Sequence, residues 1–311
     1  MENLAIIGSG TMGHSIALAA AWAGFNVKVF GVNEEDLARA DRGVRSKLQV
    51  MEENDLMDRA ESADIRSRIS LGTSLPETLQ GSTFIIEAIP EVLELKHELY
   101  REVEELVDEK VIIASNTSGC TPTSLAEKAM HPGRFIVTHF WNPGHLIPLV
   151  EVVKGKQTTQ DTVDRTMDLM HRMKKEPILL EKEVPGFIGN RLQFALFREA
   201  QSLLDEGVAS KEDIDAAAKY SIGRRLPVTG PLMSADLGGL DVFAAISEYL
   251  FEDLSAEKKP GHWLKHLVQE GKLGDKSGEG FYRWVEEGSR AINAEREQTL
   301  IHFLKQDREN Q

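Results

Sequence analysis

The start of the chain most constrains its fold, because residues 4–13, LAIIGSGTMG, pass from a strand pattern directly into a glycine turn and a helical pattern. Gly8, Gly10 and Gly13 have the spacing G-x-G-x-x-G. In such a turn the first glycine bends the chain, the second admits a pyrophosphate, and the third lets the helix pack on the strand. The free N–H groups at the helix start favour phosphate. The sequence therefore predicts a dinucleotide site that includes Gly8, Gly10, Thr11, Met12 and Gly13.

The spacing of apolar residues predicts two domains. Seven short apolar runs alternate with helical patterns, namely LAIIG, VKVFGV, FIIEAI, KVIIASN, RFIVTHF, PLVEVVKG and EPILLEKE. They indicate an α/β domain, residues 1–184, with a Rossmann-type doubly wound sheet of buried parallel strands. Helical patterns then cover 190–207, 210–222, 237–254 and 262–271. We expect an all-helical domain over 185–284 and a tail over 285–311 that forms a charged, solvated helix with frayed ends.

Composition excludes several classes of partner. The formal charge is −14, from 50 acidic residues against 36 Lys and Arg, so nucleic acid and anionic membranes would be repelled. The single cysteine, Cys120, allows no internal disulfide, and no Cys spacing suggests a metal site. The sequence shows no secretory leader and no apolar run of membrane-spanning length. These features favour a cytoplasmic protein that binds no metal.

The second apolar run raises a question about the cofactor. An acidic residue at its end would accept the ribose hydroxyls of NAD, but VKVFGVNE has Gly31 there. Three interpretations follow. The pocket accepts the extra phosphate of NADP, with Asn33 or Arg39 as its contact; NAD binds more weakly through other groups; or the site is vestigial.

The stretch RFIVTHFWNPGHLIPLVEVVKG contains a candidate acid–base pair. A strand ends at His139, an Asn-Pro-Gly loop follows, and a second strand carries Glu151. A loop that folds back between adjacent strands brings these side chains together, and a carboxylate orients a histidine and makes it more basic. The alternative is a core histidine and a strand-edge acid, and the glycine turn favours the catalytic interpretation. His145, which follows Gly144 in the loop, is expected to be exposed.

The stretch IIASNTSG also places polar residues after a strand. Asn116 and Ser118 lie where the carboxyl end of a strand in an open α/β sheet faces the ligand crevice. The alternative is a helix cap by Thr117, Ser118 or Ser124.

Taken together, these stretches resemble the L-3-hydroxyacyl-CoA dehydrogenase family. The matching segments, in order over residues 4–284, are GSGTMG, IIEAIPE with LK, SNTS, HFWNP with PLVEVV, VPGFIGNRL, EGVASKEDID and GDKSGEGFY. The resemblance implies NAD as cofactor, a helical domain that forms a homodimer, and an active site in the cleft between the domains.

The resemblance also implies roles for individual residues. His139 is the general base and Glu151 its orienting partner, while Ser118 and Asn190 hydrogen bond the hydroxyl or keto oxygen of the substrate. Further residues match positions that contact the cofactor or close over it. These are Glu91, Lys96, Asn142 and Lys276. Asn116 and Gly31, which stand at the ends of strands, are also expected to line the cofactor site.

Two departures from the family pattern bear on the substrate and the cofactor. Gly31 stands where most NAD-dependent members have Asp. The segment MEENDLMD carries four acids where acyl-CoA enzymes place basic residues near the CoA phosphates, although Arg45 and Lys47 lie one or two turns earlier. HLIPLVE, LELK and VDRTMDLM look closer to L-gulonate and carnitine dehydrogenases, which use free 3-hydroxy acids, whereas GDKSGEGFY is typical of acyl-CoA enzymes.

The sequence thus predicts an NAD(P)-dependent oxidoreductase that interconverts L-3-hydroxyacyl-CoA and 3-ketoacyl-CoA, with a small-molecule substrate as its partner. The alternative substrate is a free 3-hydroxy or 3-keto acid. A third hypothesis is a non-enzymatic nucleotide-binding or structural relative, as lens crystallins of this superfamily suggest. Gly31 is the only feature that favours it.

Overall fold

The structure is a computed structural model that describes residues 2–309. Residue 1 of the expected first domain and residues 310 and 311 of the expected tail lie outside the described residues. The chain divides into two compact units. One is a helical unit, Gly189–Asn293, and the other is a mixed unit formed by the residues up to 188 together with those from 294 onward.

The mixed unit is built on an eight-stranded sheet with the order β3-β2-β1-β4-β5-β6-β7-β8. The strands are β1 (Leu4–Ile7), β2 (Val27–Phe30), β3 (Ile69–Gly72), β4 (Phe84–Glu87), β5 (Ile112–Ser115), β6 (Phe135–Phe140), β7 (Leu149–Lys154) and β8 (Glu176–Leu180). The seven apolar runs correctly predict seven of them. β3 was missed because it is a sheet-edge strand of four residues, ISLG, of which only Ile69 is buried.

The prediction of parallel strands is wrong at one edge of the sheet. β1 to β6 pair in parallel, but β7 is antiparallel to β6, and β8 is parallel to β7. Only residues 141–148 join β6 to β7. A parallel crossover needs a dozen residues or more, so this short connection requires the chain to turn back.

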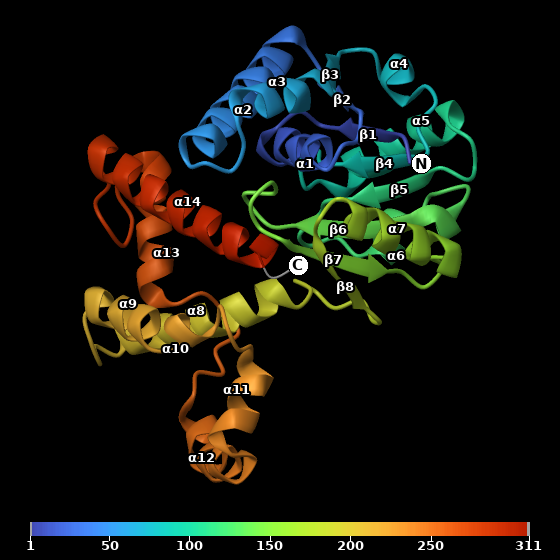
Figure 1. The fold of residues 1–311 in the computed structure, drawn as a ribbon. Helices are drawn as coiled ribbons and strands as arrows, with labels where there is room; N and C mark the ends of the chain where they lie inside the picture. Colours follow the sequence, from blue (N-terminus) through green and yellow to red (C-terminus); the bar gives the residue numbers. More distant parts are fainter. Residues whose placement is uncertain (1, 310–311) are drawn as a thin grey trace. The chain divides into compact units, whose positions relative to one another are not determined.

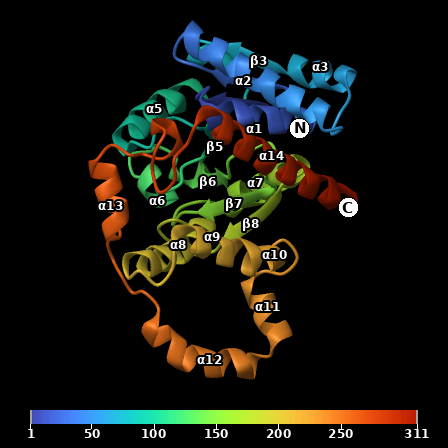
Figure 2. The same ribbon diagram turned by 90° about the vertical axis from the view of Figure 1, so that its left-hand side faces the viewer.

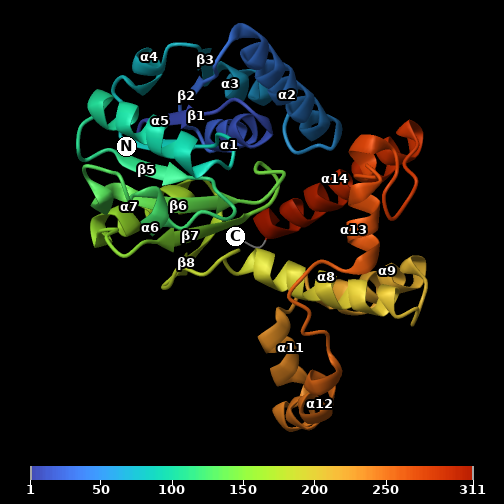
Figure 3. The ribbon, with the colours of Figure 1, turned by 180° about the vertical axis from the view of Figure 1, so that it is seen from behind.

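Helices cover both faces of the sheet. They are α1 (Thr11–Trp22), α2 (Glu34–Glu53), α3 (Arg59–Ser67), α4 (Leu75–Leu79), α5 (Leu93–Leu106), α6 (Pro122–Leu125), the 3-10 turn η1 (Pro132–Arg134) and α7 (Gln160–Arg172). One core packs α1, α2, α3 and α7 against Ile6 and Ile86. The other packs α4, α5 and α6 against Ile7 and Ile85. Figure 1 shows α1 in front of the sheet, and Figure 3, the view from the opposite side, shows α5 on the other face.

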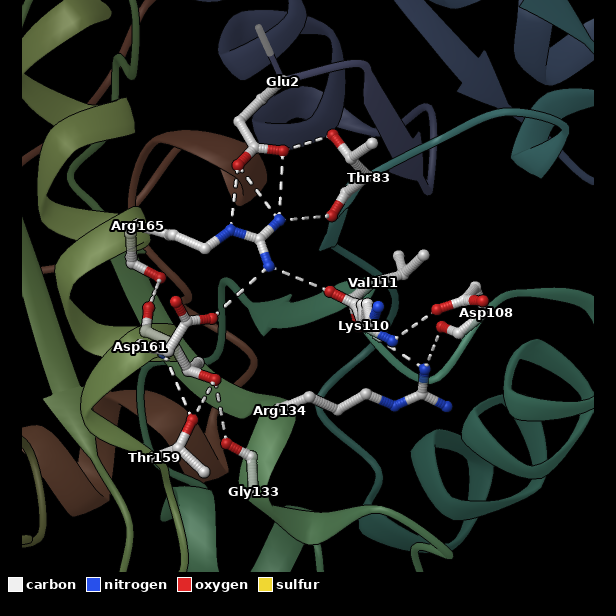
Figure 4. Close-up of polar contacts among 12 residues, drawn as sticks. Glu2, Thr83, Asp108, Lys110, Val111, Gly133, Arg134, Thr159, Asp161 and Arg165 are labelled. Atoms are coloured by element: carbon white, nitrogen blue, oxygen red, sulfur yellow. Dashed lines mark hydrogen bonds and ion pairs between the residues drawn. The ribbon is translucent and has the colours of Figure 1, made fainter.

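Polar contacts join α7 to the amino-terminal edge of the sheet (Figure 4). The Arg165 guanidinium donates to the Glu2 carboxylate at 3.1 Å and to the backbone oxygens of Lys110 at 3.0 Å and Thr83 at 3.4 Å. These three residues precede β1, β5 and β4. Arg165 therefore fixes the starts of three strands, and their carboxyl ends form the opposite edge.

The helical unit contains the predicted helices. Its elements are α8 (Gly189–Asp205), α9 (Lys211–Tyr220), α10 (Ile222–Arg225), α11 (Pro231–Gly238), α12 (Leu240–Asp253), α13 (His262–Gln269), the 3-10 turn η2 (Asp275–Ser277) and the start of α14 (Glu286–Glu309). The four predicted helices are confirmed within a few residues, and Ser210 caps α9 by accepting from Asp213 N at 3.1 Å. α11 and α12 pack on each other and project from α8–α10 (Figure 2).

The tail forms the expected helix, α14, and most of its described side chains are exposed, but the expectation of a wholly solvated helix fails near Ile301. α14 is continuous from Glu286, and its second half packs on the mixed unit. Ile301 is 2% exposed, and the Arg308 guanidinium lies 3.9 Å from the Trp22 ring centroid. Ten of the 24 residues of α14 are charged, and the packed side chains lie only in its second half, so the amphipathic pattern of the whole helix is weak. Across residues 2–309, every helix is too short or too polar to span a bilayer.

Candidate active site

His139 and Glu151 are direct partners in the β6–β7 register. His139 Nδ1 lies 2.8 Å from Glu151 Oε2, and the Glu151 side chain is fully buried. Glu151 also accepts from Trp141 Nε1 at 3.2 Å and from Ile188 N at 2.8 Å, which fixes the orientation of its carboxylate. The predicted pairing of His139 with Glu151 is confirmed as a contact.

The second ring nitrogen of the histidine is available for chemistry. His139 Nε2 has no hydrogen-bond partner among residues 2–309. The rings of Trp141 and Phe187 lie 5.6 and 5.5 Å from the imidazole and limit its movement. An imidazole held at Nδ1 by a carboxylate and open at Nε2 is arranged to accept a proton there.

The glycine turn fits a dinucleotide pyrophosphate. A Cβ added to Gly8, whose φ is +109°, would lie 2.5 Å from Ala88 O, and one on Gly13 would lie 1.8 Å from Gly8 O. Beside Gly10 nothing lies within 4 Å of the added Cβ, so the turn is open on its outer side. α1 begins there without a side-chain cap and without an acid in its first turn. Its first N–H groups, including those of Thr11 and Met12, are therefore free to bind phosphate.

The two residues that the NADP interpretation proposed as phosphate contacts, Asn33 and Arg39, have partners within the chain. Asn33 Oδ1 accepts from Asp36 N at 2.8 Å and so serves as the N-cap of α2. The Arg39 guanidinium pairs with Asp36. Both candidate contacts for an extra phosphate are thus already bonded within α2, while Gly31 itself is buried.

Lys96 contacts two carboxylates, those of Glu87 in the sheet and of Glu91 in the loop that follows it. Glu87, at the end of β4, is fully buried and accepts from Lys96 Nζ, Tyr100 OH and Ser115 Oγ, each at 2.6 Å. Burial and the Glu87 carboxylate raise the pKa of Tyr100 well above its usual value. Because Lys96 is only 1% exposed, the structure places it beneath the surface.

Glu91 organises the loop after β5. It accepts from the Thr117 hydroxyl and from the backbone N–H groups of Ser118 and Gly119 at 3.1 and 2.9 Å. Burial raises the pKa of Glu91, but the Thr117 hydrogen bond, the charge of Lys96 and the backbone donors together hold it below its ordinary value. Glu91 therefore stays ionised as the anchor of this loop.

Asn116 and Ser118 have different surroundings. Asn116 Oδ1 accepts from Phe140 N at 2.9 Å, so its side chain joins the carboxyl ends of β5 and β6. Ser118 is exposed, and its hydroxyl has no hydrogen-bond partner among residues 2–309. Thr117, in contrast, caps the following turn by accepting from Cys120 N at 2.8 Å. Of the two predicted ligand-facing residues, only Ser118 keeps its side chain free.

The loop after His139 is fixed by buried groups. The expectation that His145 is exposed is wrong, because it is 2% exposed and its Nδ1 lies 3.0 Å from Ser15 Oγ in α1. Lys175 Nζ donates to the Gly144 and Ile147 oxygens at 2.6 and 3.0 Å. These contacts hold the loop, from which Asn142 is exposed. Ser15 and Lys175 were not predicted, because Ser15 stands beside an apolar run and Lys175 stands among other charged residues.

The remaining predicted site residues belong to the helical unit. Asn190 is the second residue of α8, and Lys276 lies exposed in η2. The mixed unit therefore brings together His139, Glu151, Glu91, Lys96, Asn116, Ser118, Asn142 and the glycine turn at the carboxyl edge of its sheet. No group of three or more His, Cys, Asp or Glu suited to a metal occurs within residues 2–309.

The chain matches two family models. Residues 3–184 match the 3-hydroxyacyl-CoA dehydrogenase NAD binding domain, and residues 186–284 match the 3-hydroxyacyl-CoA dehydrogenase C-terminal domain.

Individual relatives are similar over nearly the whole chain. A 5-formyl-3-hydroxy-2-methylpyridine 4-carboxylate 5-dehydrogenase of Mesorhizobium japonicum is 34% identical over 97% of this chain and 96% of its own. A probable 3-hydroxybutyryl-CoA dehydrogenase of Deinococcus radiodurans is 37% identical over 90% of this chain and 99% of its own. A solved structure of a 5-dehydrogenase for the same pyridine acid, described as an NAD+ dependent dismutase, has a TM-score of 0.91 at 32% identity and covers 97% of both chains.

Proposed function

The chain belongs to the 3-hydroxyacyl-CoA dehydrogenase family, and on this premise we propose that it interconverts L-3-hydroxyacyl-CoA and 3-ketoacyl-CoA with His139 as the base. The NAD binding domain that the chain shares with this family assigns NAD as its cofactor. The observation that carries the proposal is the 2.8 Å contact between His139 Nδ1 and the buried carboxylate of Glu151, with Nε2 left free.

The proposed mechanism assigns a proton to one atom. His139 Nε2 accepts the proton of the C3 hydroxyl, and Glu151 stabilises the imidazolium through Nδ1–H. NAD, when bound, would accept the hydride from C3. In the reverse direction His139 returns its proton to the carbonyl oxygen. Ser118, with its free hydroxyl, is proposed to hydrogen bond the reacting oxygen, and Asn190 stays a prediction for the same task.

A second candidate substrate is a free hydroxy acid. The segment Met51–Asp58 contains four carboxylates and no basic residue. Of the nearby cations, Arg45 pairs with Asp41 at 2.7 Å and Lys47 contacts His14 at 2.9 Å, whereas Arg59, directly after the segment, is exposed. CoA phosphates would find no free basic side chain on this stretch. The relative that acts on a free pyridine carboxylate supports the same candidate.

Four initial rates separate the two substrates. The purified protein is assayed with acetoacetyl-CoA and with free acetoacetate, each with NADH and with NADPH. A rate with acetoacetyl-CoA and NADH that exceeds the free-acid rate at least about tenfold supports the thioester. The opposite ratio supports the free acid. If NADH binds but is oxidised with neither compound, both substrate proposals fail.

We also propose a homodimer formed through the helical unit. Within 189–293 only Leu267 is buried among the described side chains, whereas many large apolar side chains of α11 and α12 are exposed. They include Leu232, Met233, Leu237, Leu240, Tyr249 and Phe251. So many exposed apolar side chains on two helices that pack on each other favour an interface.

A further inference from the structure

The end of β2 is shaped so that no side chain fits at position 31 without movement. A Cβ added to Gly31 would lie 2.7 Å from Ser9 Oγ and 2.6 Å from Leu37 Cδ2. Both neighbours are buried, Ser9 at 8% exposure and Leu37 at 7%. The Ser9 hydroxyl, which belongs to the glycine turn, therefore takes the space beside the strand end that an acidic side chain would need.

The Ser9 hydroxyl also lacks a partner. Its Oγ makes no hydrogen bond within residues 2–309, and Ser9 is 8% exposed, so the hydroxyl oxygen lies at the surface of an otherwise buried residue. An unpaired hydroxyl that water can reach, on a residue held in place by its buried surroundings, is positioned to hydrogen bond a molecule that binds beside the strand end. The backbone of Ser9 is held separately, because its carbonyl lies 3.3 Å from His14 Nδ1. The hydroxyl can thus be changed without releasing the turn.

We propose that the Ser9 hydroxyl, in the space that Gly31 leaves, hydrogen bonds the adenosine ribose of NAD in place of a strand-end carboxylate. A hydroxyl donates one hydrogen bond and accepts others, as a ribose hydroxyl requires. The site lies at the end of the second strand, where this fold binds that ribose. The proposal rests on the NAD-binding part of the proposed function and is independent of the substrate.

Charge at the start of α2 completes the subsite. Its first turn carries Glu34, Glu35 and Asp36, and Glu34 and Glu35 are exposed. Arg39, the nearest cation along the helix, already pairs with Asp36. A 2′-phosphate on the ribose would meet these carboxylates without a free cation, whereas a 2′-hydroxyl would not be repelled. The subsite therefore selects NAD over NADP by repulsion.

A double-mutant cycle on NADH binding tests the role of Ser9. Dissociation constants are measured by NADH fluorescence, without substrate, for the wild type, Ser9→Ala, Gly31→Asp and the double variant. We expect Ser9→Ala alone to weaken NADH binding about fivefold, the effect of one hydrogen bond. In the Gly31→Asp background the same change has less than about a twofold effect, because the new carboxylate displaces the hydroxyl and binds the ribose itself.

Two results overturn the proposal: Ser9→Ala without effect on the wild-type background, or an equal loss on both backgrounds. Melting temperatures confirm that each variant is folded. If Gly31→Asp does not fold, Ser9→Ala on the wild type still decides. Because no substrate is present, a failure of the proposed catalytic function leaves this result unchanged.

NADPH binding tests the repulsion separately. The wild type is expected to bind NADPH at least about tenfold more weakly than NADH, and Glu34→Gln with Glu35→Gln narrows that gap without changing NADH binding more than about twofold. Equal affinities in the wild type, or an unchanged gap in the variant, contradict the charge argument.

Discussion

At the scale of single residues, His139 contacts Glu151 directly, and the buried side chains of Ser15, His145 and Lys175 fix the loop that follows His139. His139 and Glu151 were predictable because two strand patterns joined by a short loop fix which side chains face each other. His145 was not, because its burial depends on Ser15, 130 residues earlier in the chain. No local pattern records such a contact, and a histidine after a loop glycine normally indicates exposure.

The burial of His145 predicts a specific loss of stability in acid. Burial, followed by the charges of Lys47 and Lys175, lowers the pKa of His145 from 6.5 to about 3. The folded state therefore disfavours the protonated ring, and stability falls as the pH falls from about 6.5 towards about 3. At pH 5 the cost is about 2 kcal/mol relative to pH 7. Urea unfolding at both pH values is expected to show this loss in the wild type.

His145→Gln is the matched control for this effect. The amide can still hydrogen bond Ser15 Oγ but does not titrate. We expect the variant to lose about 2 kcal/mol less than the wild type between pH 7 and pH 5, while the titration of carboxylates affects both proteins alike. Equal losses in the two proteins would show that His145 is not the group responsible.

At the scale of elements, the spacing of apolar residues predicted the strands and helices. It did not predict that β7 pairs antiparallel to β6 or that α14 packs on the mixed unit. The apolar runs of β6 and β7 look alike, and only the short connection at 141–148 shows that they are antiparallel. α14 was expected to be solvated because charged residues dominate it. Its packed positions include Ile301, Arg308 and the partly buried Leu300 and Leu304, which lie only in its last turns and so do not mark the whole helix as amphipathic.

Because only the second half of α14 packs on the mixed unit, replacing isoleucine by alanine should lower the free energy of unfolding more in that half than in the first. Ile301→Ala removes a side chain that is 2% exposed, and we expect the free energy of unfolding to fall by about 2 to 4 kcal/mol. Ile292→Ala, where the side chain is 50% exposed, should change it by less than about 0.5 kcal/mol. Urea unfolding followed by tryptophan fluorescence measures both. Similar values for the two variants would mean that the second half of α14 does not pack as described.

At the scale of the whole molecule, the two units differ in exposed apolar surface: the mixed unit buries most of its large apolar side chains, whereas many of those in the helical unit are exposed. The resemblance of the sequence to its family implied a homodimer, and spacing alone could not, because exposed and core positions of a short helix have the same period. Multi-angle light scattering after gel filtration is expected to give twice the chain mass of 34.6 kDa.

Leu237→Glu in α11 should shift the protein toward the monomer, since a carboxylate in an apolar interface is costly. The side chain of Leu237 is 76% exposed in the single chain. Val285→Glu, at a position that is 70% exposed and outside α11 and α12, is the control and should leave the mass unchanged. A wild-type protein that elutes as a monomer at micromolar concentration would refute the proposed interface.

The proposed role of His139 as the base in an NAD-dependent dehydrogenation is tested by replacing its imidazole. Turnover is compared between the wild type and His139→Ala on the substrate found in the four-rate assay, with NADH affinity measured on the same samples. We expect turnover to fall at least about a hundredfold while the dissociation constant for NADH changes less than about twofold. A folded variant that keeps turnover within about threefold of the wild type would contradict it.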